Sequence, residues 1–378
     1  MERKMATKDW SALDDLVLEE ISRQLTLSQD FSVFRRVCTS WLSAAPKENF
    51  KFKSRMPWLL IPPKRGCNLG HFFIFPQVQV QGIAQQQQQQ RRVLLDTDLE
   101  TYNMLLSSKG WLLTKLVMST SLLHPLSGAQ IKLPEFPWCD RITIRKFCLS
   151  SNPSLTLDYT LMMIHGVRRE LIYSIKPGDT AWTIVDTGRN DNVDLTYCKG
   201  KFYIVNRYCQ IMVYDVKGVN PTVARVAYMP IPDNLGNVYI VESSGRLLVV
   251  TQQLLPEELA FWETETAYRA CEFQVFEVDL STNSWTKMKD LGNKTLFLGS
   301  NSSICIESDG VYFKPNRIFF MDAYRCAYYF KKKGGYHIRV YNIEDRSIEP
   351  YFLGDSSDRL SSNYNFTTPP TFIEQCSY

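Results

Sequence analysis

The chain has 378 residues, of which 44% are hydrophobic and 13% aromatic, enough apolar material for a large packed core and too much for a disordered chain. Lys and Arg number 43 against 39 Asp and Glu, and this net charge of +4 is spread without a long basic run, so composition predicts no nucleic-acid partner. The ten cysteines include no C-x-x-C pair and the four histidines form no ligand pattern, so we predict neither a disulfide scaffold nor a metal or cofactor site.

The sequence MERKMATKDW at the N-terminus is charged and lacks an apolar centre, so it does not read as a secretory signal. No stretch approaches the roughly 18 consecutive apolar residues of a membrane-spanning helix. We therefore expect an intracellular protein in the nucleus, the cytoplasm or both, without a membrane partner.

The first predicted element is an amphipathic helix within DWSALDDLVLEEISRQL. Ser11, followed three residues later by Asp14, is its predicted N-terminal cap. Polar residues occupy one face, and apolar residues recur at three- and four-residue steps on the other: Leu13, Leu16, Val17, Ile21 and Leu25.

A second helix is predicted to begin after Ser28 or Asp30 and to end before Pro46, which cannot continue the amide ladder. Its apolar stripe contains Phe31, Phe34, Val37, Cys38, Trp41 and Leu42. Two helices this short are marginal in water and too apolar to cover one another. We expect either the rest of the chain or a partner protein to bury them.

The strings LDDLVLEEISRQL and FRRVCTSW resemble an F-box, a domain with a leucine-rich first helix and a V-C-x-x-W second helix. The resemblance covers roughly residues 10 to 46 and predicts an F-box domain over residues 8–50. Asp14 stands where a proline is customary, and Leu16 where an acidic residue is common. An F-box binds the Skp adaptor of cullin-based ubiquitin ligases, and the resemblance assigns that contact to Leu13, Val17, Leu18, Ile21, Leu25, Phe34, Val37, Cys38 and Trp41, with Trp41 the expected hot spot.

Beyond residue 56 the pattern becomes that of short strands separated by Gly, Pro, Asn and Asp. A unit of strand, polar turn and strand recurs five times, for example VFEVDLSTNSWTKM from 275 and VYNIEDRSIEPYFL from 340, and a further strand precedes each copy. Trp182 and Trp285 occupy matching positions, which favours packing between units over a ligand cage.

This spacing predicts a mainly β fold, a β-propeller of about six blades over residues 57–378, preceded by the small helical domain. An open stack or a pair of β-sandwiches is the alternative. A sixth unit is expected from WLLIPP, HFFIFP and RRVLL, closed by PPTFIEQC at the C-terminal end. Strings such as YIVESSGRLLVV and NRIFFMDA resemble the C-terminal domain of a large plant F-box family, the KIB-like group.

No residue pattern predicts bond chemistry in the body. GSNSS at 299–303 lacks the spacing of a nucleophile elbow, and the scattered histidines offer no catalytic pair. The six glutamines at 85–90 are predicted to form a loop. The insertion 252–271 and the loop 324–336 are the candidate binding loops.

Together these observations predict a non-enzymatic substrate-recognition subunit of an SCF-type ubiquitin ligase, which binds the Skp adaptor, through it cullin, and an unknown protein substrate. The alternative is an F-box-derived scaffold that binds its target without ubiquitination. A sugar-binding or enzymatic propeller is disfavoured.

Overall fold

The computed structural model describes residues 10, 13–25, 31, 33–46, 57–61, 69–74, 90–94, 102–116, 119–125, 127–136, 144–166, 170–188, 191–216, 223–229, 232–254, 271–299, 303–308, 314–321, 338–351 and 371–374. The chain separates into two compact units, Met1–Arg55 with Ser377–Tyr378, and Met56–Cys376. We call them the helical unit and the body. The glutamine run up to residue 89, residues 255–270 of the first candidate loop and the whole of the second lie outside the described residues.

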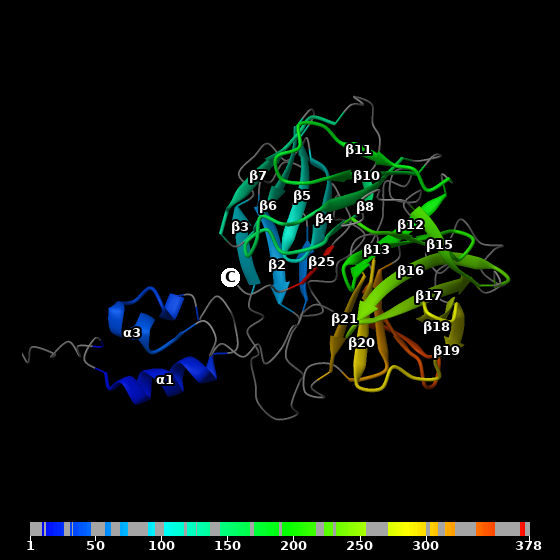
Figure 1. The fold of residues 1–378 in the computed structure, drawn as a ribbon. Coiled ribbons are helices and arrows are strands. Elements are labelled where there is room, and N and C mark those ends of the chain that lie inside the picture. The colour runs from blue at the N-terminus through cyan, green and yellow to red at the C-terminus, as the bar shows by residue number, and fades with distance from the viewer. Residues whose placement is uncertain are drawn as a thin grey trace, which may run out of the picture. The chain divides into compact units, whose positions relative to one another are not determined.

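The helical unit contains helix α1, Asp15–Gln24, and the short helix α3, Thr39–Ser43 (Figure 1). Among the described residues no helix is long and apolar enough to cross a membrane.

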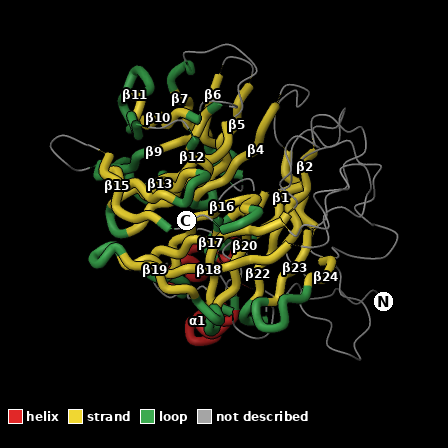
Figure 2. Tube along the Cα trace, turned by 90° about the vertical axis from the view of Figure 1, so that its right-hand side faces the viewer, coloured by secondary structure: helices red, strands yellow, loops and turns green. Residues whose placement is uncertain are grey.

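The strands of the body form six separate sheets, which follow one another around it (Figures 1 and 2). Four of these sheets consist of four consecutive antiparallel strands. Their strands are β4 Tyr102–Ser108, β5 Trp111–Leu116, β6 Ser119–Leu123 and β7 Gln130–Leu133; β8 Ile144–Leu149, β9 Leu161–His165, β10 Leu171–Ile175 and β11 Thr183–Val185; β12 Asn192–Cys198, β13 Lys201–Asn206, β14 Gln210–Tyr214 and β15 Val223–Tyr228; and β16 Leu235–Ser243, β17 Arg246–Leu254, β18 Cys271–Asp279 and β19 Ser284–Lys287.

The fifth sheet has an additional strand and the order β21-β20-β22-β23-β24. Strand β20 lies between β21 and β22, antiparallel to the first and parallel to the second. The bounds are β20 Lys294–Leu298, β21 Ile304–Glu307, β22 Arg317–Met321, β23 Ile338–Asn342 and β24 Ile348–Tyr351.

The sixth sheet joins the two ends of the body. Strand β25, Thr371–Ile373, pairs antiparallel with β1, Trp58–Ile61, which continues to β2, Leu69–Ile74, and β3, Gln90–Leu94. Phe372 is fully buried, and its ring lies 5.2 Å from that of Phe297 on β20. The C-terminal strand therefore closes the ring, as the sequence predicts.

The prediction of a mainly β propeller behind a small helical region is confirmed. Five blades are built from one continuous stretch of chain each, rather than about six, and the remaining sheet is a composite of both ends. The repeated hairpins are the two outer strands of each continuous blade, such as β18–β19 and β23–β24.

Apolar side chains fill the spaces between neighbouring sheets. Trp182 belongs to the cluster shared by β4–β7 and β8–β11, and its Nε1 donates to the carbonyl of Pro134 at 3.0 Å. Trp285 packs against the cluster between β12–β15 and β16–β19. The prediction that both tryptophans pack between blades is confirmed.

Candidate functional site

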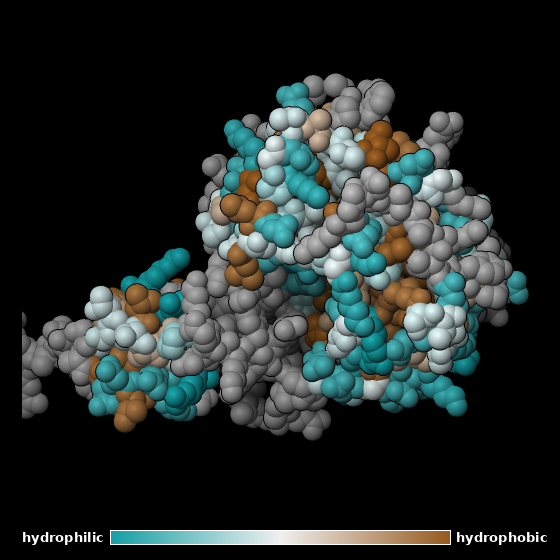
Figure 3. Space-filling model, viewed as in Figure 1, coloured by the Kyte–Doolittle hydropathy of each residue, from teal (hydrophilic) through white to brown (hydrophobic). Residues whose placement is uncertain are grey.

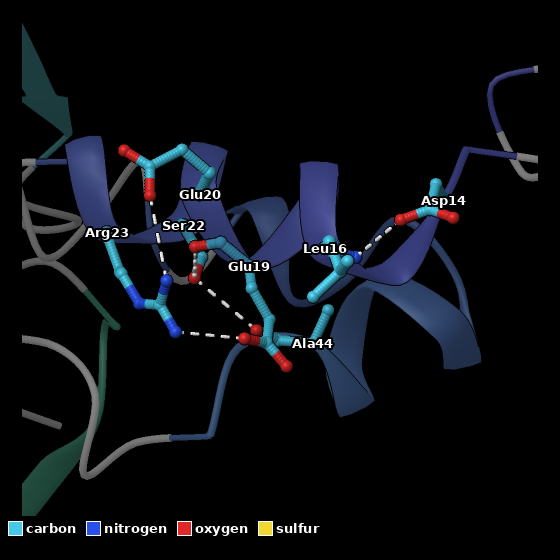
Figure 4. Close-up of polar contacts among 7 residues, drawn as sticks. All are labelled: Asp14, Leu16, Glu19, Glu20, Ser22, Arg23 and Ala44. Atoms are coloured by element: carbon cyan, nitrogen blue, oxygen red, sulfur yellow. Dashed lines mark hydrogen bonds and ion pairs between the residues drawn. The ribbon is translucent and has the colours of Figure 1, made fainter.

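Helix α1 begins at an aspartate cap. The Asp14 carboxylate accepts a hydrogen bond from the backbone N–H of Leu16 at 2.8 Å, so the cap is Asp14 and the predicted Ser11 cap is wrong (Figure 4). Asp14 thus satisfies one of the backbone N–H groups that have no partner within the helix at its start. On the exposed side, Arg23 pairs with Glu19 at 2.9 Å and with Glu20 at 3.6 Å.

The second predicted helix is interrupted. Phe31, Val33 and Phe34 have helical backbone, but Cys38 is extended, with φ −162° and ψ 179°, and caps α3 without a side-chain hydrogen bond. The single helix expected over this stretch is therefore wrong, although α3 does end before Pro46. Val, Cys, Thr and Ser, which surround the break, are weak helix formers.

The helical unit has its own small core. Leu18 is 0% exposed and packs with Phe31, Phe34, Ala44 and Ala45, while Leu13, Leu25 and Trp41 cover the edge of this cluster. The Trp41 ring lies 4.5 Å from that of Phe34, and its Nε1 donates to the carbonyl of Trp10 at 3.1 Å. Ser22, also buried, donates to the Glu19 carbonyl at 2.7 Å, and its Oγ lies 3.4 Å from the carbonyl oxygen of Ala44 at the end of α3 (Figure 4).

A second set of apolar side chains remains exposed on the helical unit, where apolar atoms reach the surface among polar ones (Figure 3). Leu16 is 75% exposed and Val37 51%. Among the residues of this unit that the structure describes, the exposed apolar set is Trp10, Leu16, Val17, Ile21, Val33, Val37 and Leu42.

The structure thus divides the nine residues predicted to bind the adaptor. Val17, Ile21 and Val37 are exposed, whereas Leu18 and Phe34 are buried and Leu13, Leu25, Cys38 and Trp41 are half-buried. Sequence reasoning left Leu16, Val33 and Leu42 out of the contact set. The i, i+4 spacing of Val33 and Val37 was the available signal.

The inner strands of the body meet in a buried polar network. Lys146 on β8 and Asp194 on β12 form an ion pair at 3.2 Å, with side chains 7% and 1% exposed. Lys146 also donates to the carbonyl of Gly299 at 3.0 Å, and Asp194 accepts from the N–H of Ile240 at 3.1 Å and the hydroxyl of Ser303 at 3.0 Å. These contacts therefore connect residues from four neighbouring sheets.

Burial raises the pKa of Asp194, and this is opposed by the Lys146 ammonium and by the N–H groups of Ile240 and Leu195. These donors offset part of the cost of burying the carboxylate, and Lys146 and Ile240 come from neighbouring sheets, so the pair serves the architecture of the ring.

The described part of the body offers no activated nucleophile or metal cluster. Burial raises the pKa of the Cys148 thiol to about 12 and that of Cys209 to about 11, which makes both thiols inert at neutral pH. Burial lowers the pKa of His124 to about 4. No group of three or more His, Cys, Asp or Glu residues in the described ranges could hold a metal ion.

Both candidate binding loops begin and end on equivalent strands. The first connects β17 to β18, the second connects β22 to β23, and β17 and β22 each run antiparallel to the innermost strand of their sheet. Because inner strands of a propeller share one direction, the two connections leave the same end of the ring. The connections β9–β10 and β13–β14 leave that end as well.

The architecture defines the class, a β-propeller protein with a small helical unit ahead of the ring. The family model described as the KIB1-4 beta-propeller matches residues 83–342, and the chain belongs to that family. The family resemblance of the sequence is confirmed.

The relatives include plant F-box proteins. A putative F-box protein of Arabidopsis thaliana is 27% identical over 182 residues, which cover 47% of this chain and 48% of the relative, so the chain spans about half of that protein. The Arabidopsis F-box protein SKIP23 is 26% identical over 355 residues, covering 80% of this chain and 81% of the relative. Among solved structures, a luciferin-regenerating enzyme aligns with a TM-score of 0.34 and 10% identity, over 63% of this chain and 78% of that one.

Proposed function

We propose that this protein is the substrate-recognition subunit of an SCF-type cullin-RING ubiquitin ligase. The helical unit binds the Skp adaptor, and through it cullin, while the body binds a protein substrate. The observation that carries the proposal is the exposed apolar set on a unit whose sequence resembles an F-box, in a chain whose relatives are named F-box proteins.

The energetics favour a partner on this unit. Burying a large aliphatic side chain contributes about 1.5 to 3 kcal/mol, and among the described residues of the helical unit fewer apolar side chains are buried in its core than are exposed on its surface. Six exposed aliphatic residues supply enough apolar area for a stable interface after the entropy of association is subtracted.

The exposed and the buried apolar residues of the helical unit take different roles in this proposal. Leu16, Val17, Ile21, Val33, Val37 and Leu42 contact the adaptor directly. Leu18, Phe34 and Trp41 act from inside, since they fix the angle between α1 and α3.

The chain carries out no bond chemistry in this proposal. The ligase's RING subunit and the conjugating enzyme supply catalysis, and the receptor contributes proximity by raising the effective concentration of a substrate lysine. The site of action is intracellular, in the nucleus, the cytoplasm or both.

The test is titration calorimetry of the full chain with the purified Skp adaptor of the same organism. Val17→Glu and Val37→Glu place a charge in the proposed interface and are expected to weaken binding at least about a hundredfold, because a buried unpaired carboxylate costs several kcal/mol. Glu20→Gln, on the polar side of α1, is the matched control and should bind normally.

Unaltered adaptor binding by both charged variants would contradict the interface. A folded wild-type chain that does not bind the adaptor, and binds its target without ubiquitination, would favour the scaffold alternative.

A further inference from the structure

Several segments of the body meet at the end of the ring where the candidate binding loops leave it. Ile144 at the start of β8 pairs with His165 at the end of β9, and His165 pairs with Leu171 at the start of β10. Glu170 forms a backbone bridge with Asp191, just before β12. This end of the ring therefore joins the blades β8–β11 and β12–β15.

One buried carboxylate holds two arginines there. Glu170 is 2% exposed, and its Oε1 lies 3.3 Å from the Arg145 guanidinium and 3.5 Å from that of Arg207. The Arg207 side chain is 53% exposed. Two guanidinium groups therefore converge on one buried carboxylate, and Arg207 leaves about half of its side chain accessible to a partner.

Side-chain hydrogen bonds hold the turn that carries Arg207. The side-chain oxygen of Asn206 accepts the N–H groups of Tyr208 at 3.0 Å and Gln210 at 2.9 Å, and Cys209 takes the left-handed conformation with φ 55°. Tyr208 is 42% exposed beside Arg207. An arginine and a tyrosine on a preorganised turn are residue types enriched in interaction hot spots, and they lose little entropy on binding.

We propose that Arg145, Arg207 and Tyr208, held by Glu170, form an arginine surface that binds an acidic segment of the protein substrate. The proposal rests on the proposed function, in that it names the chemistry of the substrate. A guanidinium binds a carboxylate through two parallel hydrogen bonds, and Tyr208 supplies an apolar contact beside them. Glu170 is a positioning residue that orients both guanidinium groups. It keeps its ion pairs with both arginines when a carboxylate of the substrate binds.

The experiment measures fluorescence anisotropy of the full chain with three labelled probes: a short peptide of alternating Glu and Gly, the same peptide with Gln for Glu, and a single-stranded oligothymidylate. Arg207→Ala and Tyr208→Ala test the turn, and Arg207→Lys keeps the charge but loses the two-pronged donor. Arg246→Ala is the matched control. Arg246 is a similarly exposed arginine, paired with Glu277 at 3.0 Å, and it lies at the start of β17, at the opposite end of that strand from the loop between β17 and β18.

We expect the Glu peptide to bind more tightly than the Gln peptide, and added salt to weaken it. Arg207→Ala should weaken binding about tenfold, Arg207→Lys less, and Arg246→Ala not at all. A melting temperature for each variant confirms that it is folded.

Equal affinity for the two peptides, or an equal loss in Arg246→Ala, would overturn the proposal. Tighter binding of the oligonucleotide than of the Glu peptide would also overturn it, in favour of a nucleic-acid surface. Titration of the same samples with the adaptor separates the arginine surface from the proposed function. Normal adaptor binding with no preference for the Glu peptide refutes the arginine surface alone. Loss of adaptor binding refutes the proposed function.

Discussion

The buried ion pair at the centre of the ring gives a quantitative prediction. Asp194→Ala removes the charge partner of the buried Lys146 ammonium, which still donates to the Gly299 carbonyl, and it removes the acceptor of the Ile240 and Leu195 amides and of the Ser303 hydroxyl. Removing one member of a buried pair costs about 3 to 5 kcal/mol of unfolding free energy. At about 2 °C per kcal/mol for a body of this size, the melting temperature should fall by roughly 6 to 10 °C.

The assay is urea unfolding followed by tryptophan fluorescence, with calorimetry for the melting temperature. The exposed pair Arg246–Glu277 supplies the control, since Arg246→Gln should change the unfolding free energy by less than about 1 kcal/mol. Replacing both Lys146 and Asp194 by apolar residues, Lys146→Met with Asp194→Leu, should cost less than the sum of the single changes. If Asp194→Ala is no more destabilising than the control, the network does not hold the sheets together.

Three further predictions concern closure, pH and the helical unit. Deleting residues 364–378 removes β25 and should lower the melting temperature of the body, and Phe372→Ala alone should lower the unfolding free energy by about 3 to 5 kcal/mol. An unchanged melting temperature for the deletion would show that β25 does not close the ring. Burial lowers the pKa of His124 from 6.5 to about 4, so the unfolded chain binds a proton at a higher pH than the folded chain does, and the stability of the body should decline as pH falls from 6.5 towards 4. His124→Gln should show a flatter pH dependence of the melting temperature, and profiles identical to the wild type would refute this assignment. Asp14→Ala removes the N-cap and should destabilise the helical unit by about 1 kcal/mol, seen as faster amide exchange of Leu16 to Leu18, with Asp15→Ala as the control that keeps the cap.

Local sequence signals located the outer strands well and the inner strands poorly. Hairpins such as β18–β19 have apolar strands around an Asp-Leu-Ser-Thr-Asn turn, in which Asp279 accepts the N–H of Ser281, so sequence alone identifies them. Inner strand β12 buries Asp194, which breaks the apolar pattern because its partners come from other blades. The β20 insertion was missed for a related reason, since its parallel pairing with β22 depends on contacts distant in sequence.

The same distinction applies to the candidate site. The spacing of apolar residues in α1 predicted that the helix has an apolar face. It did not predict which of those residues are buried within the helical unit, because this depends on where α3 packs. Leu18 and Val17 are adjacent in sequence, yet one is buried and the other exposed. Arg207 and Glu170 are 37 residues apart, and no short pattern connects them.

The most direct test of the account is size-exclusion chromatography of the full-length wild-type chain with the purified Skp adaptor and cullin. The account predicts that the three proteins elute together, and that Val37→Glu elutes apart from the other two with its body still folded. A well-folded wild-type chain that elutes apart from the adaptor at micromolar concentration would contradict the receptor function.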